Sequence, residues 1–267
     1  EIPRKQRHLV QNREHESLNV GLGKGRVTYM NFNELISNVF GGGNAALYAE
    51  AVFVTLKIIF FSTVLSYVIG LPVGVLLYGT ADGSIFPNRF VNAAVGLIVN
   101  LLRSVPFIIL LVMTQPLAKL LVGTKIGNKA FIFYLVISAA PFVARMVESS
   151  LKEVNSGVIE AALSMGANKF QLITKVLVPE AKPSLIVGGA IAVTTILGYT
   201  PMTYLVAGGG LGQVAIQYGL YRFDSTKMYV SSILLVILVQ VLQESLGTLA
   251  RRTDRRIRNS RKKVKKD

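Results

Sequence analysis

The sequence predicts an all-α integral membrane protein with five transmembrane helices. Of its 267 residues, 51% are hydrophobic and only 16% are charged, which is too apolar a composition for an ordinary soluble domain. Five apolar stretches each approach the roughly 20 helical residues that a hydrocarbon core requires, and none alternates like a transmembrane β-strand. The stretches are residues 51–78, 91–122, 130–147, 184–206 and 228–246. We therefore assign residues 51–250 to one transmembrane domain.

Prolines and a lysine interrupt the first two stretches. Pro72 and Pro106 each lack the backbone N–H that a helix uses, so we expect a kink or a break at both. Such a feature is either a fixed packing kink or a moving hinge. Lys57, near the outer end of the first stretch, can extend its ammonium group to the membrane surface.

Three charged side chains fall within or beside the apolar stretches, namely Arg103, Arg145 and Glu148. An unpaired charge inside a membrane costs at least ~2.5 kcal/mol. Arg145 and Glu148 are three residues apart on one expected helix, so they can form an ion pair. Arg103 can either reach the cytoplasmic surface or join Glu148. We interpret the three residues as a structural ion network.

The fourth stretch, residues 184–206, carries hydroxyl-bearing side chains, among them Thr195 and Tyr199. Such residues are typical of closely packed membrane helices. Alternatively, this helix lines a translocation pathway, and Met202 closes the pathway as an adaptable apolar plug. The sequence leaves both interpretations open.

The distribution of basic residues predicts the orientation. Residues 251–267 hold ten lysines and arginines and two aspartates, so eight of the fifteen net positive charges lie in this tail. A basic segment directly after a span is typical of the cytoplasmic side. With the tail inside, six further basic residues in the 79–90 and 145–183 connections are cytoplasmic, against five on the opposite side. We expect the C-terminus inside, the N-terminus outside, and a tail that contacts anionic lipid rather than nucleic acid.

Residues 1–50 form a mixed-charge extracytoplasmic extension without the apolar core of a signal peptide. Because the sequence opens at Glu1 rather than at methionine, we expect either processing or a longer chain. Five apolar residues of the extension share one helical face, which predicts a short interfacial helix. They are Phe32, Leu35, Ile36, Val39 and Phe40.

Reactive groups of the kinds that enzymes use do not converge in this sequence. There is no cysteine, and His8 and His15 lack partners at metal-binding spacing. Residues 21–25, GLGKG, lack the serine or threonine that follows the lysine of a phosphate-binding loop. Residues 208–212, GGGLG, do not open a helix after a strand. We expect no metal, no cofactor and no catalysis on this chain.

A polar, helix-forming stretch, residues 156–179, separates the third and fourth apolar stretches. Asn155 or Ser156 can cap a first helix, and Gly166 can end it. Asn168, with Gln171 three residues later, suits a capping box that starts a second helix.

The second helix is expected to end at Pro179. Phe170, Ile173 and Leu177 share one face of it, and small residues nearby allow another surface to approach the backbone. These features fit a docking surface, but an ordinary loop packed on the bundle explains them equally well.

The same stretch resembles the cytoplasmic loop signature of ABC importer permeases. The signature residues occur here as Glu160, Ala161, Ala162, Gly166, Val176, Val178 and Pro179. Both aliphatic positions hold valine where the family usually has isoleucine and leucine. Four further stretches resemble methionine-type importer permeases in particular, and the resemblance covers roughly residues 50–250. These stretches are residues 69–75, 103–108, 140–148 and 209–213.

The resemblance implies a type I importer permease fold that forms a homodimer in the cytoplasmic membrane of a prokaryote. Two ATPase subunits would bind ATP and Mg²⁺, and an extracytoplasmic binding protein or lipoprotein would deliver the substrate. Residues 156–179 would be the coupling helices that contact the ATPase. The contacting residues would be Glu160, Ala161, Ala162, Gly166, Ala167, Asn168, Lys169, Phe170 and Pro179.

The function that follows from the resemblance is uptake of D- or L-methionine by alternating access. The same machinery could instead carry another amino acid, a dipeptide or an osmolyte. A protein of a different class, an ion-coupled secondary transporter, would need paired intramembrane carboxylates or inverted repeats, and the sequence offers neither clearly.

Overall fold

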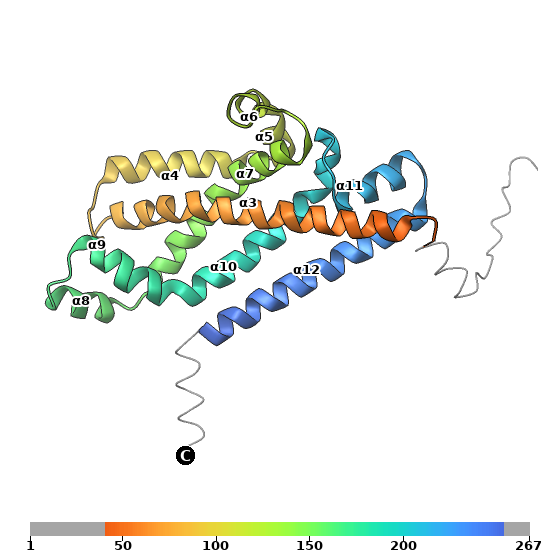
Figure 1. The fold of residues 1–267 in the computed structure, drawn as a ribbon. Coiled ribbons are helices and arrows are strands. Elements are labelled where there is room, and N and C mark those ends of the chain that lie inside the picture. The colour runs from red at the N-terminus through yellow and green to blue at the C-terminus, as the bar shows by residue number, and fades with distance from the viewer. Residues whose placement is uncertain (1–40, 254–267) are drawn as a thin grey trace, which may run out of the picture. The chain divides into compact units, whose positions relative to one another are not determined.

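The structure is a computed structural model that describes residues 41–253, and every regular element in that range is helical (Figure 1). The expected interfacial helix around residues 32–40 and the tail from residue 254 lie outside the described residues. The elements are α3 (Asn44–Thr80), α4 (Arg89–Ser104), α5 (Phe107–Met113), α6 (Gln115–Val122), α7 (Gly127–Lys152), α8 (Ser156–Ser164), α9 (Lys169–Gln171), η1 (Leu172–Leu177), α10 (Val178–Tyr199), η2 (Thr200–Val206), α11 (Leu211–Ile216), η3 (Gln217–Tyr221) and α12 (Ser225–Thr253).

Four helices within residues 41–253 are long and apolar enough to cross a membrane. They are α3, α7, the continuous helix Lys169–Val206, and α12. A fifth crossing exists if α4 and α5 count together, although their axes bend by 108°. If this bent pair is counted as one span, the predicted number of five spans is confirmed.

The two prolines in the first spans have different effects. Pro106 stands at the break between α4 and α5 as the N-cap of α5, where a helix needs no N–H from it. Pro72 lies inside α3, which continues without a break from Asn44 to Thr80. The chain therefore turns sharply at Pro106, whereas α3 accommodates Pro72.

The two helices α3 and α7 pack closely along their length. A β-carbon at Gly70 of α3 would lie 2.7 Å from the Cβ of Val143, and one at Gly74 would lie 2.5 Å from the carbonyl oxygen of Ala144. No side chain fits at those distances, so glycine at both positions permits the close approach of the two backbones. This pair forms the centre of the bundle.

The last helix, α12, lies on the outside of the bundle. Only 6% of its most apolar window is buried, and Tyr229, Ile233 and Ile237 are more than half exposed. One side of α12 packs against α10 and α11. The remaining apolar surface requires cover from lipid or from another protein surface.

Clusters of buried apolar residues fill the bundle, and two of them are the largest. The first includes the stacked rings of Phe107 and Tyr199, whose centroids are 4.4 Å apart. The second includes Val147 of α7 together with Leu172 and Leu177 of η1. The second cluster contains residues of α7, α8 and η1, so the short polar helices pack against the bundle through it.

Candidate functional site

The short helix α8 is capped at both ends. The Oδ1 atom of Asn155 accepts a backbone N–H two residues further on, at 2.8 Å. At the other end Gly166 adopts a φ of +82°, and the N–H groups of Gly166 and Ala167 donate to the carbonyl oxygens of Leu163 and Ala162 at 2.9 and 3.1 Å. These two bonds form a Schellman C-cap, which leaves few unpaired groups at the helix end. The predicted helix end at Gly166 is confirmed.

The next helix, α9, begins with the predicted capping box. The Oδ1 atom of Asn168 accepts the N–H of Gln171 at 2.8 Å, and the Oε1 atom of Gln171 accepts the N–H of Asn168 at 3.0 Å. These reciprocal bonds fix the direction in which the second short helix leaves the turn.

The predicted end of this second helix at Pro179 is wrong. The π-helical η1 continues directly into α10, and Pro179 lies in the first turn of α10. A proline is tolerated at this junction because the π-helical turns before it already interrupt the regular hydrogen bonds to the fourth residue back. Residues 169–206 are therefore one continuous helical element, which joins α9 to the fourth span.

Apolar side chains lie on two opposite faces of the short helices. Leu172 and Leu177 are buried in the second cluster together with Ala162. In contrast, Met165 is 82% exposed and Phe170 is 74% exposed. The prediction that Phe170 shares the face of Leu177 is wrong, because the wide turns of the π-helix between them change the periodicity.

The structure gathers most of the predicted coupling residues on one exposed segment. Ala162 is buried and Ala167 is half-buried, whereas the others are exposed to solvent. The exposed residues are Glu160, Ala161, Gly166, Asn168, Lys169, Phe170 and Pro179. The segment thus presents a rigid, capped surface that carries exposed apolar side chains.

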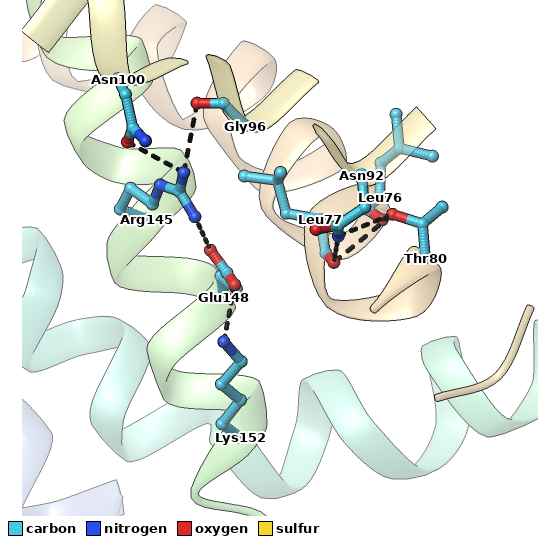
Figure 2. A network of polar contacts seen from close by, with 9 residues as sticks. All are labelled: Leu76, Leu77, Thr80, Asn92, Gly96, Asn100, Arg145, Glu148 and Lys152. Atoms are coloured by element: carbon cyan, nitrogen blue, oxygen red, sulfur yellow. Dashed lines mark hydrogen bonds and ion pairs between the residues drawn. The ribbon is translucent and has the colours of Figure 1, made fainter. Parts of the chain in front are cut away.

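An ion network joins α7 to α4, and Figure 2 shows it from close by. The Nη1 atom of Arg145 and the Nζ atom of Lys152 each lie 2.7 Å from a carboxylate oxygen of Glu148. The Nη2 atom of Arg145 donates to the Oδ1 atom of Asn100 at 2.9 Å and to the carbonyl oxygen of Gly96 at 3.2 Å. Arg145 therefore bridges the carboxylate on its own helix and the backbone of α4.

Arg103 does not occupy its predicted place in this network. Its guanidinium lies over the ring of Phe142, 5.9 Å from the centroid. Lys152 takes the second position on Glu148, because a lysine four residues further along the same helix reaches the carboxylate directly.

A neighbouring polar contact joins α4 to α3 (Figure 2). The Nδ2 atom of Asn92 donates to the carbonyl oxygen of Leu77 at 2.7 Å and to the hydroxyl of Thr80 at 3.0 Å. No spacing along the chain predicts that Asn92 or Asn100 would pair with these groups. Three helices, α3, α4 and α7, are thereby linked by polar contacts at the end that carries α8.

The three predicted pathway residues lie along the fourth span and η2. The hydroxyl of Thr195 donates to the carbonyl oxygen of Ile191 at 2.9 Å. Tyr199 stacks on Phe107, and Met202 packs half-buried against the first cluster. Thr195 and Tyr199 have partners within the protomer, and Met202 lies in η2.

A glycine-rich loop, Ala207–Gly210, lies at the opposite end of the bundle from α8 and α9 (Figure 1). The N–H of Gly209 donates to the Oδ1 atom of Asn128 at 2.7 Å, and the N–H of Leu211 donates to the hydroxyl oxygen of Thr55 at 2.9 Å. Thr55 belongs to α3 and Asn128 to α7. The sequence pattern did not single out either residue, because both are distant from the loop along the chain.

A tight turn between η3 and α12 lies near this loop's end of the bundle (Figure 1). Phe223 has a φ of +55° and is 85% exposed. The Nζ atom of Lys227 donates to the carboxylate of Asp224 at 2.7 Å, and this hydrogen bond lowers the pKa of Asp224. The turn thus ends in an exposed aromatic ring beside a fixed ion pair.

This chain matches one protein family model and is similar to several known proteins. The family model of the binding-protein-dependent transport system inner membrane component matches residues 70–259. A probable D-methionine transport system permease protein MetI of Vibrio cholerae is 44% identical over 213 residues, which cover 80% of this chain and 95% of the relative. The corresponding protein of Pasteurella multocida is 43% identical over 76% of this chain and 93% of its own length.

Solved structures show the same arrangement of helices. An inward-facing structure of the MetNI methionine ABC transporter contains a chain that is 45% identical, with a TM-score of 0.76, and the match covers 79% of this chain and 97% of that one. A chain of an amino acid ABC transporter with histidines has a TM-score of 0.65 at 17% identity, covering 84% of this chain, which supports the fold alone.

Proposed function

This chain belongs to the family of binding-protein-dependent transport system inner membrane components, and from that membership we propose that it is the membrane-spanning subunit of an ABC importer for methionine. Substrate would cross the cytoplasmic membrane by alternating access, while ATP is hydrolysed on a separate ATPase subunit. The similarity to permeases of D-methionine transport systems supports methionine as the cargo.

The exposed coupling segment is the observation that carries this proposal. Met165 and Phe170 are 82% and 74% exposed although both are apolar. The neighbouring helix ends are held by the Schellman cap at Gly166 and by the capping box at Asn168. A rigid surface of this kind suits an ATPase that pulls on it, because little of the motion would be lost in rearranging the segment itself.

The continuity of η1 and α10 supports force transfer into the membrane. The exposed coupling residues are followed by one helical path from Lys169 to Val206, which ends at η2. Movement of the coupling segment would therefore reach Met202 through a single element. In this proposal Met202 closes the pathway in the resting state, together with Thr195 and Tyr199 on the same helical path.

The assembly is proposed to contain two copies of this chain, two ATPase subunits and an extracytoplasmic binding protein or lipoprotein. The exposed apolar surface of α12 supports burial against lipid or a second copy. The coupling segment would face the cytoplasm, and the Ala207–Gly210 loop would face the outside. The basic residues from Arg251 onward support this orientation and would attract anionic lipid at about 1 kcal/mol per residue near the surface.

A methionine uptake assay distinguishes this proposal from other cargoes and from other transport mechanisms. If the cargo were another amino acid, a dipeptide or an osmolyte, that compound would be imported and labelled methionine would not. An ion-coupled transporter would import without an ATPase, but Glu148, the buried carboxylate of α7, is already held by Arg145 and Lys152.

Substitution of Gly166 tests the coupling assignment. A β-carbon there has no atom within 4 Å, so a side chain would project outward, while the φ of +82° disfavours most residues. Gly166→Asn tolerates this backbone and serves as the matched control, whereas Gly166→Phe adds a bulky ring.

We expect Gly166→Phe to abolish ATPase co-purification and ATP-dependent methionine uptake while the protein still inserts in the membrane. Gly166→Asn should retain more of both activities. Normal recruitment of the ATPase by the Gly166→Phe variant would contradict the coupling assignment. Uptake of labelled methionine by the unaltered complex, competed by other amino acids, tests the cargo separately.

A further inference from the structure

We propose that Thr55 and Asn128 form a latch that holds the outer end of the transport pathway closed and releases it during each cycle. This inference rests on the proposed function, because it concerns the gate of an importer. The latch residues act by positioning the Ala207–Gly210 loop and the helices on either side of it.

The two latch bonds tie the loop to the central helices. Asn128 of α7 accepts the N–H of Gly209 at 2.7 Å, and Thr55 of α3 accepts the N–H of Leu211 at 2.9 Å. The hydroxyl of Thr55 donates its own proton to the carbonyl oxygen of Ala51 at 2.8 Å, so its oxygen is oriented to accept. Thr55 and Leu211 are almost fully buried.

The loop fits against these residues with no spare room. A β-carbon at Gly210 would lie 2.8 Å from the hydroxyl oxygen of Thr55, and one at Gly208 would lie 3.0 Å from the Oδ1 atom of Asn128. The glycines thus allow the backbone to reach both acceptors directly.

The loop is coupled to the helix that carries the proposed gate. A β-carbon at Gly212 of α11 would lie 2.5 Å from the backbone nitrogen of Pro201 in η2. Because α11 and η2 pack backbone against backbone, they move together. Holding the loop therefore holds Met202, which is the residue after Pro201.

The two hydrogen bonds of the latch are easier to break and re-form than a packed helix contact. The contact between α3 and α7 is apolar, and the two backbones approach closely at Gly70 and Gly74. If these helices separated, water could not replace the packing contacts that would be lost. The latch consists of two single hydrogen bonds near the end of the bundle, where entering water can satisfy the freed groups. Each bond changes a two-state population by about threefold to tenfold, which a transport cycle can overcome.

Variants that keep or remove the acceptor oxygen test the latch in the assembled complex. Thr55→Val and Asn128→Leu remove an acceptor, whereas Thr55→Ser and Asn128→Asp retain one. In proteoliposomes without binding protein, we expect each acceptor-free variant to raise basal ATP hydrolysis and leakage of preloaded labelled methionine about threefold to tenfold. The acceptor-retaining controls should stay within about twofold of the unaltered complex, and leakage equal in all four variants would overturn the proposal.

A reversible crosslink tests the same latch in the opposite direction. A β-carbon at Gly209 would lie 3.3 Å from the Cγ1 atom of Val54, which is the position that a cysteine sulfur would take. The Val54→Cys and Gly209→Cys pair therefore suits a disulfide, and the chain has no other cysteine to compete. Neither substitution removes the two latch bonds.

After oxidation we expect this double variant to lose ATP-driven methionine uptake, and addition of a reductant should restore it. Each single-cysteine variant should be insensitive to oxidation. The crosslink is verified on a gel. If the oxidised double variant then imported methionine as fast as the same variant after treatment with reductant, the loop would not move and the proposal would be wrong. Absence of methionine uptake by the unaltered complex would instead count against the cargo of the proposed importer.

Discussion

Replacing Phe170 with alanine is expected to weaken binding of the ATPase while leaving the permease as stable as before. The ring is 74% exposed, so it contributes little to the permease's own core. A phenylalanine carries roughly 200 Å² of surface, of which about 150 Å² is therefore free to be buried by a partner. At about 25 cal/mol per Å², burial of that surface contributes at most ~4 kcal/mol.

Alanine keeps the β-carbon, so the expected loss is smaller than this maximum. We therefore expect a loss of ~2–3 kcal/mol in binding free energy for Phe170→Ala, which raises the dissociation constant by roughly 30-fold to 150-fold. The measurement is a titration of labelled ATPase onto the permease in lipid nanodiscs.

Phe223→Ala is the matched control for this experiment. Phe223 is also strongly exposed, at 85%, but it belongs to the turn between η3 and α12, and that turn is far from α8 and α9 (Figure 1). Its removal should leave the ATPase dissociation constant unchanged. A dissociation constant for Phe170→Ala within threefold of that of the unaltered chain, or a lowered midpoint of thermal unfolding, would contradict this prediction.

Three further predictions concern packing, charge and the gate. Gly74→Leu should lower the free energy of unfolding by ~1–3 kcal/mol, because its β-carbon would meet α7 at 2.5 Å; Gly198→Ala, which has open space, should be close to neutral in the same denaturation assay. Glu148→Gln should lower the free energy of unfolding by ~1–3 kcal/mol, because it leaves the half-buried Arg145 without its carboxylate partner. Replacing the more exposed Lys152 should lower it by less than ~1 kcal/mol. Equal losses for the two variants would contradict the geometry. Met202→Ala should increase substrate leakage from loaded vesicles, and unchanged leakage with normal transport would remove Met202 as a gate.

The sequence predicted the parts of the site that depend on neighbouring residues. The cap at Gly166 and the capping box of Asn168 with Gln171 are local arrangements, and the structure contains both. The pairing of Arg145 with Glu148 is equally local and is also present. In each case the spacing along one helix determines the contact.

The features that the sequence did not predict depend on contacts between distant parts of the chain or on unusual helix geometry. Thr55 and Leu211 are 156 positions apart, and nothing in either neighbourhood indicates the other. The expected helix end at Pro179 is wrong because the π-helical turns of η1 accommodate this proline inside a continuous helical element. Arg103 was misplaced because its distance from Glu148 depends on how α4 packs against α7.

The close contact between α3 and α7 has a practical consequence for following the motion of this protein. Because the backbone of α3 at Gly70 and Gly74 lies too close to α7 for even a β-carbon, we expect these two helices to move as one unit. They therefore provide an internal reference frame for spectroscopy. The chain contains no cysteine and no tryptophan, so one probe introduced on α3 and one on α10 or α12 would be the subunit's only labels of their kind. The distance between them would report movement of α10 or α12 relative to α3.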